Sequence, residues 1–160
     1  MTGPLTLYAA HPMTAYGTAG EARALRRLAA LFPAFDVADP STMFSDGASW
    51  HDLWPGVLDQ VDLLAIFADR EGCVGVGCLK EIADAIAAYL PVVALGPRGG
   101  LRAFGGVAID CGPVVDRAQI GRLLYGPAIP APRVADLAGD ARRLRAVLAG
   151  RSVPVGEKGP

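Results

Sequence analysis

The sequence predicts an α/β fold: a doubly wound, mostly parallel sheet of four to five strands flanked by helices, of the Rossmann or flavodoxin-like class. Short apolar runs alternate with amphipathic segments of helical length, which favours parallel strands joined by helices. The run from Leu63 to Phe67 is apolar throughout, as is typical of a parallel strand covered on both faces. A turn containing Gly75 and Gly77 then leads into a helical pattern, and open α/β sheets bind ligands at such junctions.

The length and composition indicate one domain. A chain of 160 residues can bury a core without disulfides or metal, and 52% of its residues are hydrophobic while 19% are charged. We expect a single folded domain over residues 1–149. Residues 150–160 are rich in glycine, proline and charge, so we expect them to form a disordered tail.

Five apolar runs are candidates for strands. The first ends at His11 and Pro12, because proline has no N–H group to donate to a ladder. The second is short and stops at Asp39 and Pro40. The five predicted strands span residues 5–10, 35–37, 63–67, 92–95 and 106–109.

Helical patterns separate these runs. Thr18 and Glu21 have the spacing of a capping box, which places the start of the first helix near residue 19. Pro55 lies in the second helical pattern and is tolerated only in a first turn. The predicted helices span about residues 19–32, 50–61, the glycine turn to residue 90, 116–124, and a last segment around 134–148.

Apolar side chains at helical spacing predict which face of each helix is buried. The first helix carries basic side chains outside its apolar stripe, and the third carries Lys80 and Asp84 outside its own. The expected buried residues are Leu25, Leu28, Ala29 and Phe32 in the first helix, Leu79, Ile82, Ala83 and Ile86 in the third, and Val134, Leu137, Ala141, Leu144 and Leu148 in the last.

Charge and composition exclude several partner classes. The net charge is −1 and no basic cluster is present, so long nucleic acids are not expected as partners. No run approaches the roughly 20 apolar residues of a membrane span, and no secretory signal pattern opens the chain, so we expect a soluble, cytoplasmic protein. Its three cysteines lack CxxC spacing and nearby histidines, which argues against a disulfide framework or a zinc site. Cys73 and Cys78 are interpreted as small packing residues.

The predicted topology brings several polar side chains to one edge of the sheet. Parallel strands end at the same rim, so Tyr8, His11, Asp69, Glu71 and Glu81 are expected in one crevice. The glycines before Glu81 would allow a ligand to approach the backbone closely. The third glycine of the dinucleotide fingerprint is missing, so an NAD-binding Rossmann site is not predicted.

Four short motifs and one tripeptide occur along the chain in the same order as in a known family. They are Leu7-Tyr8-Ala9-Ala10-His11-Pro12, Asp62-Leu63-Leu64-Ala65-Ile66, Gly77-x-x-x-Glu81-Ile82 and Leu90-Pro91-Val92-Val93-Ala94, with Tyr16-Gly17-Thr18 before the first helix. Over roughly residues 5–95 the chain resembles the nucleoside 2-deoxyribosyltransferase-like superfamily, which includes nucleotide N-glycosidases.

The resemblance implies that Glu81 is the catalytic nucleophile, which attacks the anomeric carbon of a ribose or deoxyribose. It also implies that Tyr8 orients this carboxylate by a hydrogen bond. The chemistry of a carboxylate agrees with the role implied for Glu81, because a carboxylate can stabilise an oxocarbenium-like transition state and form a glycosyl-enzyme. Glu81 near a helix N-terminus would stay ionised. The alternatives are that Glu81 is a surface or capping acid and that Tyr8 is a core aromatic residue.

The substrate-binding candidates are His11, Tyr16, Gly17, Thr18, Asp52, Asp69, Gly75 and Gly77. His11 would bind the sugar or a phosphate, or serve as a structural donor. Thr18 and the first N–H groups of its helix would bind a 5′-phosphate, or Thr18 would simply cap the helix. Where the family usually has an aspartate that holds the base, this chain has Trp54, and Asp52, Asp69 or Glu71 would have to replace it.

The predicted function is therefore cleavage of the N-glycosidic bond of a nucleoside or nucleoside 5′-monophosphate, with water or a second base as acceptor. No metal or redox cofactor is needed. The resemblance implies a homodimer or higher homo-oligomer, in which a neighbouring subunit completes the site. The alternatives are a non-catalytic nucleotide-sensing domain, favoured by Trp54, and an NAD glycohydrolase.

Overall fold

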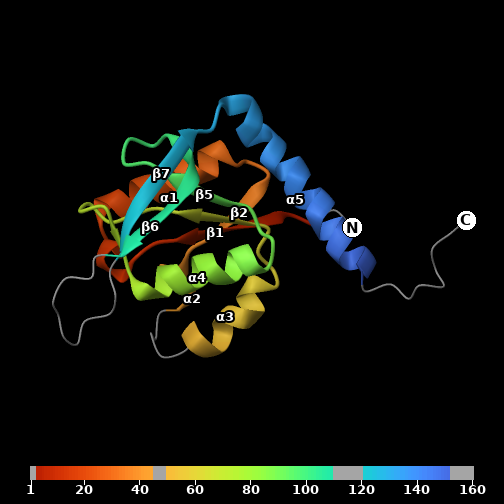
Figure 1. The fold of residues 1–160 in the computed structure, drawn as a ribbon, viewed down its shortest axis with the longest axis horizontal. Coiled ribbons are helices and arrows are strands. Elements are labelled where there is room, and N and C mark those ends of the chain that lie inside the picture. The colour runs from red at the N-terminus through yellow and green to blue at the C-terminus, as the bar shows by residue number, and fades with distance from the viewer. Residues whose placement is uncertain (1–2, 45–49, 110–120, 152–160) are drawn as a thin grey trace, which may run out of the picture.

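A computed structural model describes residues 3–44, 50–109 and 121–151 of the chain. Its centre is a seven-stranded sheet in the order β2-β1-β3-β5-β6-β7-β4, covered by helices on both faces (Figure 1). The strands are β1 (Leu5–Ala10), β2 (Phe35–Ala38), β3 (Leu63–Ile66), β4 (Cys73–Val74), β5 (Val92–Leu95), β6 (Leu101–Ile109) and β7 (Gly121–Ala128). The helices are η1 (Met13–Ala15), α1 (Ala19–Leu31), α2 (Pro40–Met43), α3 (Trp50–Leu58), α4 (Val76–Ala87) and α5 (Ala131–Arg151).

The predicted fold class is confirmed. Strands β2, β1, β3 and β5 pair in parallel and form the doubly wound part of the sheet. Tyr8 on β1 lies between Ala38 of β2 and Leu64 of β3, which places it in the middle of this parallel part. The chain leaves β1 towards α1 and β2 on one side and reaches β3 on the other. The carboxyl ends of β1 and β3 therefore form the switch point where such sheets bind ligands.

Two helical layers enclose two separate cores. Figure 1 shows α1 and α5 on one side of the sheet and α3 and α4 on the other. On the first side, Leu28 and Phe32 of α1 and Val134 and Ala141 of α5 pack against Leu7, Leu63 and other residues of the sheet. On the second side, Trp54 and Ile82 pack against Tyr8, Leu64 and Ile66. Successive residues of β3 thus face opposite cores, which explains why this strand is apolar throughout.

The antiparallel extension of the sheet was not predicted. A turn closed by hydrogen bonds from the Gly96 N–H to the Gly100 carbonyl and from the Gly99 N–H to the Gly96 carbonyl joins β5 to β6, and β6 and β7 then pair antiparallel. Gly105 and Gly126 lie where these strands meet so closely that a Cβ atom on either would come within 2.9 Å of the other strand's backbone. Glycines that suggested loops therefore belong to strands here, because only they permit this approach.

The prediction of a helix at residues 116–124 is wrong for the part of this range that the structure describes. Residues 121–124 belong to β7, and residues 116–120 lie outside the described residues. The pairing of Leu123 with Val107 of β6 decides the conformation, since tertiary contacts override weak helical patterning. The first helix, the strand at 92–95 and the last helix are found where predicted, but Ala29 and Leu148, which were expected to be buried, are exposed. The expected tail begins too early, because residues 150 and 151 belong to α5, and residues 152–160 lie outside the described part.

Helices α3 and α4 differ from their predicted form. Pro55 lies at the sixth position of α3, beyond the first turn, and the helix ends at Leu58 rather than Val61. In α4 the predicted stripe is partly wrong, because Ala83 is exposed and Ile86 is 53% exposed. The buried residues of α4 are Cys78, Glu81, Ile82 and Ala85. The helix therefore packs an acid against the sheet and turns an isoleucine outwards.

None of the helices in the described residues is long and apolar enough to cross a membrane.

An ion pair joins α5 to the start of β3. Asp62 is 7% exposed, and its carboxylate accepts hydrogen bonds from the backbone N–H of Thr6 and from the guanidinium of Arg145, whose Nε lies 2.9 Å from Oδ1. This pair holds the last helix against the N-terminal end of β3.

We expect Arg145→Ala to lower the free energy of unfolding by about 1–3 kcal/mol, because it leaves a nearly buried carboxylate without its cation. Urea unfolding at pH 7 measures the change. Arg142→Ala removes an exposed arginine of the same helix and should change stability by less than about 0.5 kcal/mol. Equal losses in the two variants would show that the Asp62 pair does not anchor α5.

Candidate active site

Glu81 is the centre of the candidate site. It is the sixth residue of α4, whose N-cap is Gly75, and it is 5% exposed. The prediction of a position near the helix N-terminus is therefore wrong, because the first turn of α4 contains no acid. The alternative of a surface or capping acid is equally excluded. Glu81 instead points into the core between α4 and the strands.

Two donors from distant parts of the chain hold one oxygen of Glu81. The Tyr8 hydroxyl on β1 and the Trp50 Nε1–H on α3 each donate a hydrogen bond of 2.8 Å to Oε1. A carboxylate oxygen accepts two hydrogen bonds through its two lone pairs, so Oε1 is saturated. Oε2 has no hydrogen bond to any described residue. The two hydrogen bonds to Oε1 thus fix the orientation of the carboxylate.

The electrostatics of Glu81 are unusual for a glutamate. Burial raises its pKa to about 7, the hydrogen bonds from Tyr8 and Trp50 lower it, and the nearby charge of Asp84 raises it. No described cation forms an ion pair with Glu81, since the adjacent Lys80 pairs with Asp84 at 2.8 Å. A buried carboxylate with neutral donors alone therefore changes its protonation state near neutral pH. Perturbed groups of this kind are concentrated at functional sites.

Tyr8 is fully buried, and burial together with the charge of Glu81 raises the pKa of its hydroxyl far above the usual range. The hydroxyl therefore remains a proton-bearing donor. The Tyr8–Glu81 contact that the resemblance implies is present. The Tyr8 ring lies 4.9 Å from the ring of Trp54, centroid to centroid.

Trp54 occupies the position where the resembled family has an aspartate. Its side chain is buried, and its Nε1–H donates to Asp84 Oδ2 at 2.9 Å. The Lys80 hydrogen bond lowers the pKa of Asp84 against the effect of burial. Trp54 thus packs against the Tyr8 ring, and it provides no carboxylate in place of the family's aspartate.

Tyr16 and Cys78 are close enough to Glu81 to interact with its charge. Burial raises the pKa of Tyr16 to about 12, with a further contribution from Glu81. Burial likewise raises the pKa of Cys78 to about 12, so its thiol stays protonated and packs in the core, as expected for a packing residue. Tyr16, which precedes α1, is half-buried and brings a second phenol near the carboxylate.

Gly75 and Gly77 lie at the start of α4, one turn or more before Glu81. A Cβ atom at either position would meet no other atom within 4 Å. Both glycines are half-buried, so the space beside them is open but recessed. The backbone there leaves room for a ligand, in agreement with the role predicted for these glycines.

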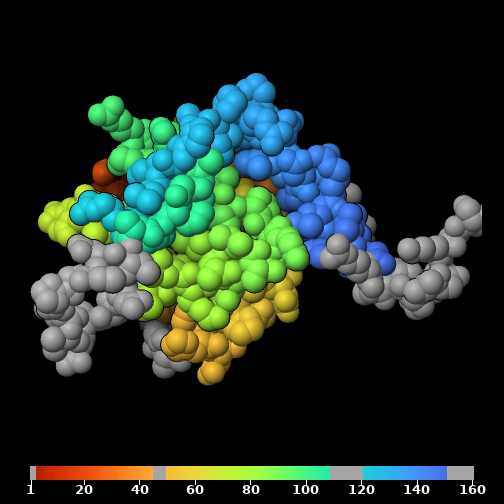
Figure 2. Space-filling view, viewed as in Figure 1, coloured from red at the N-terminus to blue at the C-terminus, as the bar shows by residue number. Residues whose placement is uncertain are grey.

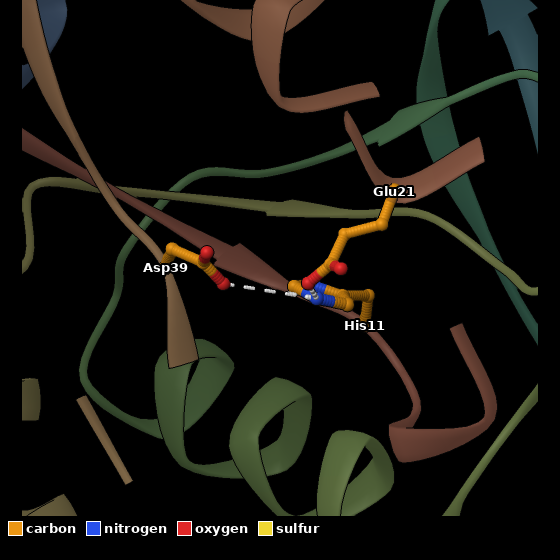
Figure 3. Close-up of side chains that lie close together, drawn as sticks. All are labelled: His11, Glu21 and Asp39. Carbon is orange, nitrogen blue, oxygen red and sulfur yellow. Dashed lines mark hydrogen bonds and ion pairs between the residues drawn. The ribbon is translucent and has the colours of Figure 1, made fainter. Parts of the chain in front are cut away.

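His11 belongs to a buried network rather than to an open surface (Figure 3). Its Nδ1 lies 2.7 Å from the Ala9 carbonyl oxygen, and its Nε2 lies 2.9 Å from Glu21 Oε1 and 3.8 Å from Asp39 Oδ1. The ring stacks on Phe67 at 4.4 Å. Both ring nitrogens are therefore occupied inside the protein. The predicted contact of His11 with a sugar or phosphate has no free donor to make it.

His11, Glu21 and Asp39 have ligand atoms within 4.8 Å of one another, the arrangement of a possible metal site. The protein itself satisfies these atoms. Glu21 Oε2 accepts from the backbone N–H of Gly17, and the Asp39 carboxylate accepts from the N–H and the hydroxyl of Ser41. The donor set is explained by hydrogen bonds that join the ends of β1 and β2 to the start of α1.

The capping box at the start of α1 is confirmed with one difference. Thr18 is the N-cap, and its hydroxyl accepts from the Glu21 N–H at 3.1 Å and donates to the Ala15 carbonyl. The Glu21 carboxylate returns to Gly17, which has a φ of +73°, and to His11. Burial opposes ionisation of Glu21, but the hydrogen bonds from His11 and Gly17 lower its pKa.

The three acids proposed to replace the family aspartate do not contact Glu81. Asp69 holds the turn before β4, where its carboxylate accepts from Thr14 Oγ1 at 2.8 Å and from two backbone N–H groups. Burial opposes ionisation of Asp69, but these hydrogen bonds lower its pKa. Glu71 and Asp52 are exposed. Among the described residues, none of the three has a hydrogen bond to Tyr8 or Glu81.

Sequence reasoning missed Trp50. It was predicted only as the first residue of a helix, 31 residues before Glu81, and nothing in its spacing indicated a polar contact. One chemical signal was present, because an indole N–H that is removed from water needs an acceptor. That signal does not identify the acceptor, which depends on how α3 packs on α4.

The raised pKa of Glu81 predicts how stability depends on pH. Glutamate has an ordinary pKa of 4.5, so the folded protein binds this proton more tightly than the unfolded chain does. Stability is therefore lost as the pH rises from 4.5 to about 7 and stays lower above it. Glu81→Gln should unfold with a free energy similar to that of the native chain at pH 4.5 and roughly 3 kcal/mol higher at pH 8.

Urea unfolding at the two pH values measures this difference. Glu71→Gln is the matched control, because an exposed acid is not removed from water on folding. A Glu81→Gln variant that is less stable than the native chain at pH 8 would contradict the assignment of a buried, strained carboxylate.

Comparison of the chain with protein-family models, with curated proteins and with solved structures found no match.

Proposed function

We propose that the protein cleaves the N-glycosidic bond of a nucleoside or a nucleoside 5′-monophosphate through a covalent glycosyl-Glu81 intermediate. One observation carries the proposal. The buried Glu81 carboxylate accepts hydrogen bonds from Tyr8 and Trp50 at Oε1, and its Oε2 has no hydrogen bond to a described residue. This is the arrangement that a nucleophilic carboxylate needs, with a fixed direction and one free lone-pair oxygen. The motifs that resemble nucleoside deoxyribosyltransferases support the same chemistry.

In the first step, Glu81 Oε2 attacks the anomeric carbon of the sugar. The bond from that carbon to the base nitrogen breaks, and the base leaves with the bonding electrons and takes a proton from water. In the second step, water attacks the same carbon, the ester bond to Glu81 breaks, and the proton of the water goes to solvent. A second base in place of water would give a transferase. The carboxylate also stabilises the oxocarbenium-like charge of both transition states.

Tyr8 and Trp50 act as positioning residues in this scheme. Their neutral donors lower the pKa of Glu81 and so favour its reactive, ionised form. They also fix the plane of the carboxylate, which keeps Oε2 in place for attack. Tyr16, together with Gly75 and Gly77, is proposed to contact the sugar. A 5′-phosphate would meet the N–H groups at the start of α1 rather than the Thr18 hydroxyl, which is already engaged.

The first test is base release. We expect the native protein to liberate free base from at least one member of a panel of nucleosides, nucleoside 5′-monophosphates and NAD, measured by chromatography. Glu81→Gln should lower the rate by about 1,000-fold or more, because it removes the nucleophile. Adding a second free base distinguishes a transferase, which forms a new nucleoside, from a hydrolase.

No release from any compound of the panel would contradict the proposal. Tight nucleotide binding that Glu81→Gln leaves unchanged, without turnover, would instead assign a non-catalytic sensing domain. Nicotinamide release from NAD as the dominant activity would assign an NAD glycohydrolase.

The second test is the pH profile. Because the ionised form of Glu81 is the nucleophile, kcat/KM should rise with pH and level off above about 7. Tyr8→Phe and Trp50→Phe each remove a donor that stabilises the carboxylate, so the pKa of Glu81 should rise and the acid limb should move to higher pH. Tyr89→Phe, at a residue 76% exposed, is the control and should leave the profile unchanged. A shift to lower pH in either positioning variant would refute this role.

A further inference from the structure

A cavity of about 1260 Å³ lies beyond the carboxyl ends of β3 and β5. It is enclosed by the first turns of α1, the segment that follows β3 and the loop that follows β5. Figure 2 shows these parts of the chain at the left, where red atoms are visible between the green loop and the yellow-green segment. Neither Tyr8 nor Glu81 lines the cavity. Its size is ample for a small-molecule ligand.

Four arginines from three separate segments line this cavity. Arg23 and Arg27 come from α1, Arg70 follows β3, and Arg98 lies in the loop after β5. Arg27 is held in place by a hydrogen bond of 2.8 Å from its Nε to the Gly99 carbonyl oxygen, so α1 is tied to the loop that carries Arg98. Within the described residues none of the four forms an ion pair. The charge of Arg70 contributes to lowering the pKa of Asp69, and the guanidinium N–H groups without a hydrogen bond to a described residue can donate to a ligand.

Three acids share the lining with the four arginines. Glu21 is bound to His11 and Gly17, and Asp69 is bound to Thr14 and to two backbone N–H groups. Glu71 is the remaining acid and is exposed. The lining thus carries four guanidinium groups and three carboxylates, and hydrogen bonds inside the protein engage two of these carboxylates.

We propose that this cavity binds the diphosphate or triphosphate group of a ligand. One guanidinium group can donate two parallel hydrogen bonds to the oxygens of a phosphate. Several arginines from different elements can therefore surround a chain of phosphates. The four arginines come from three segments, and a diphosphate or triphosphate, with its two or three phosphate groups, can contact more of them than a single phosphate can. The cavity includes the start of α1, where the proposed function places a 5′-phosphate, but none of its residues supplies the glycosidic chemistry at Glu81.

Isothermal titration of the full chain with inorganic pyrophosphate at low ionic strength tests the proposal. We expect saturable binding with one site, which weakens about tenfold or more in the double variant Arg23→Gln/Arg98→Gln. Arg26→Gln is the matched control, because Arg26 is an exposed arginine of the same helix that does not line the cavity. Circular dichroism verifies that each variant is folded, and Glu81→Gln should bind pyrophosphate as tightly as the native chain does.

Each further outcome decides a part of the proposal. Inorganic phosphate binding as tightly as pyrophosphate, an equal loss in Arg26→Gln, or no binding to the native chain would overturn it. Tighter binding of a nucleoside diphosphate than of pyrophosphate would assign the phosphates to a nucleotide. Equal binding of the two would assign a site that contacts the phosphates alone.

Discussion

The structure depends on burying the Glu81 carboxylate with neutral donors instead of a cation. Taking a carboxylate out of water is costly unless its oxygens are hydrogen-bonded. Here β1 supplies the Tyr8 hydroxyl and α3 supplies the Trp50 indole, both at 2.8 Å. Helix α4 is turned so that Glu81 faces the sheet, which leaves Ile86 exposed. One side chain thus sets the rotation of one helix and the position of a second.

A second buried network orders the opposite side of the same sheet edge. His11 connects the Ala9 carbonyl at the end of β1 to Glu21 in the first turn of α1, and lies 3.8 Å from Asp39 beyond β2. Glu21 in turn holds Gly17, so the segment that carries Tyr16 is tied at both ends. Tyr16 can then lie near Glu81 although it belongs to the approach to α1. The two networks therefore share the loop after β1, which links the two cores.

Sequence patterns predicted what local chemistry controls. The apolar strand β3, the Thr18 cap and the parallel order follow from burial, capping and chain alternation. Residues 106–109 were predicted as a strand and belong to β6, but its antiparallel pairing with β7 could not be predicted, since Gly105 and Gly126 act through contact with the facing strand rather than through local preference. The buried face of α4 was missed because hydrophobic periodicity assigns an acid to the outside. The Tyr8–Glu81 contact came from family resemblance, and Trp50 had no such guide.

Neutral donors are better suited than a cation to the proposed chemistry. A lysine or arginine beside Glu81 would hold it ionised at lower pH, but the glycosyl ester is neutral, so the cation would then be buried without its partner. A hydroxyl and an indole N–H can donate to the carboxylate and equally to the carbonyl oxygen of the ester. Oε1 would keep both hydrogen bonds throughout, while Oε2 alone changes its bonding. The raised pKa of Glu81 is the consequence of this choice, because the donors offset only part of the cost of burial.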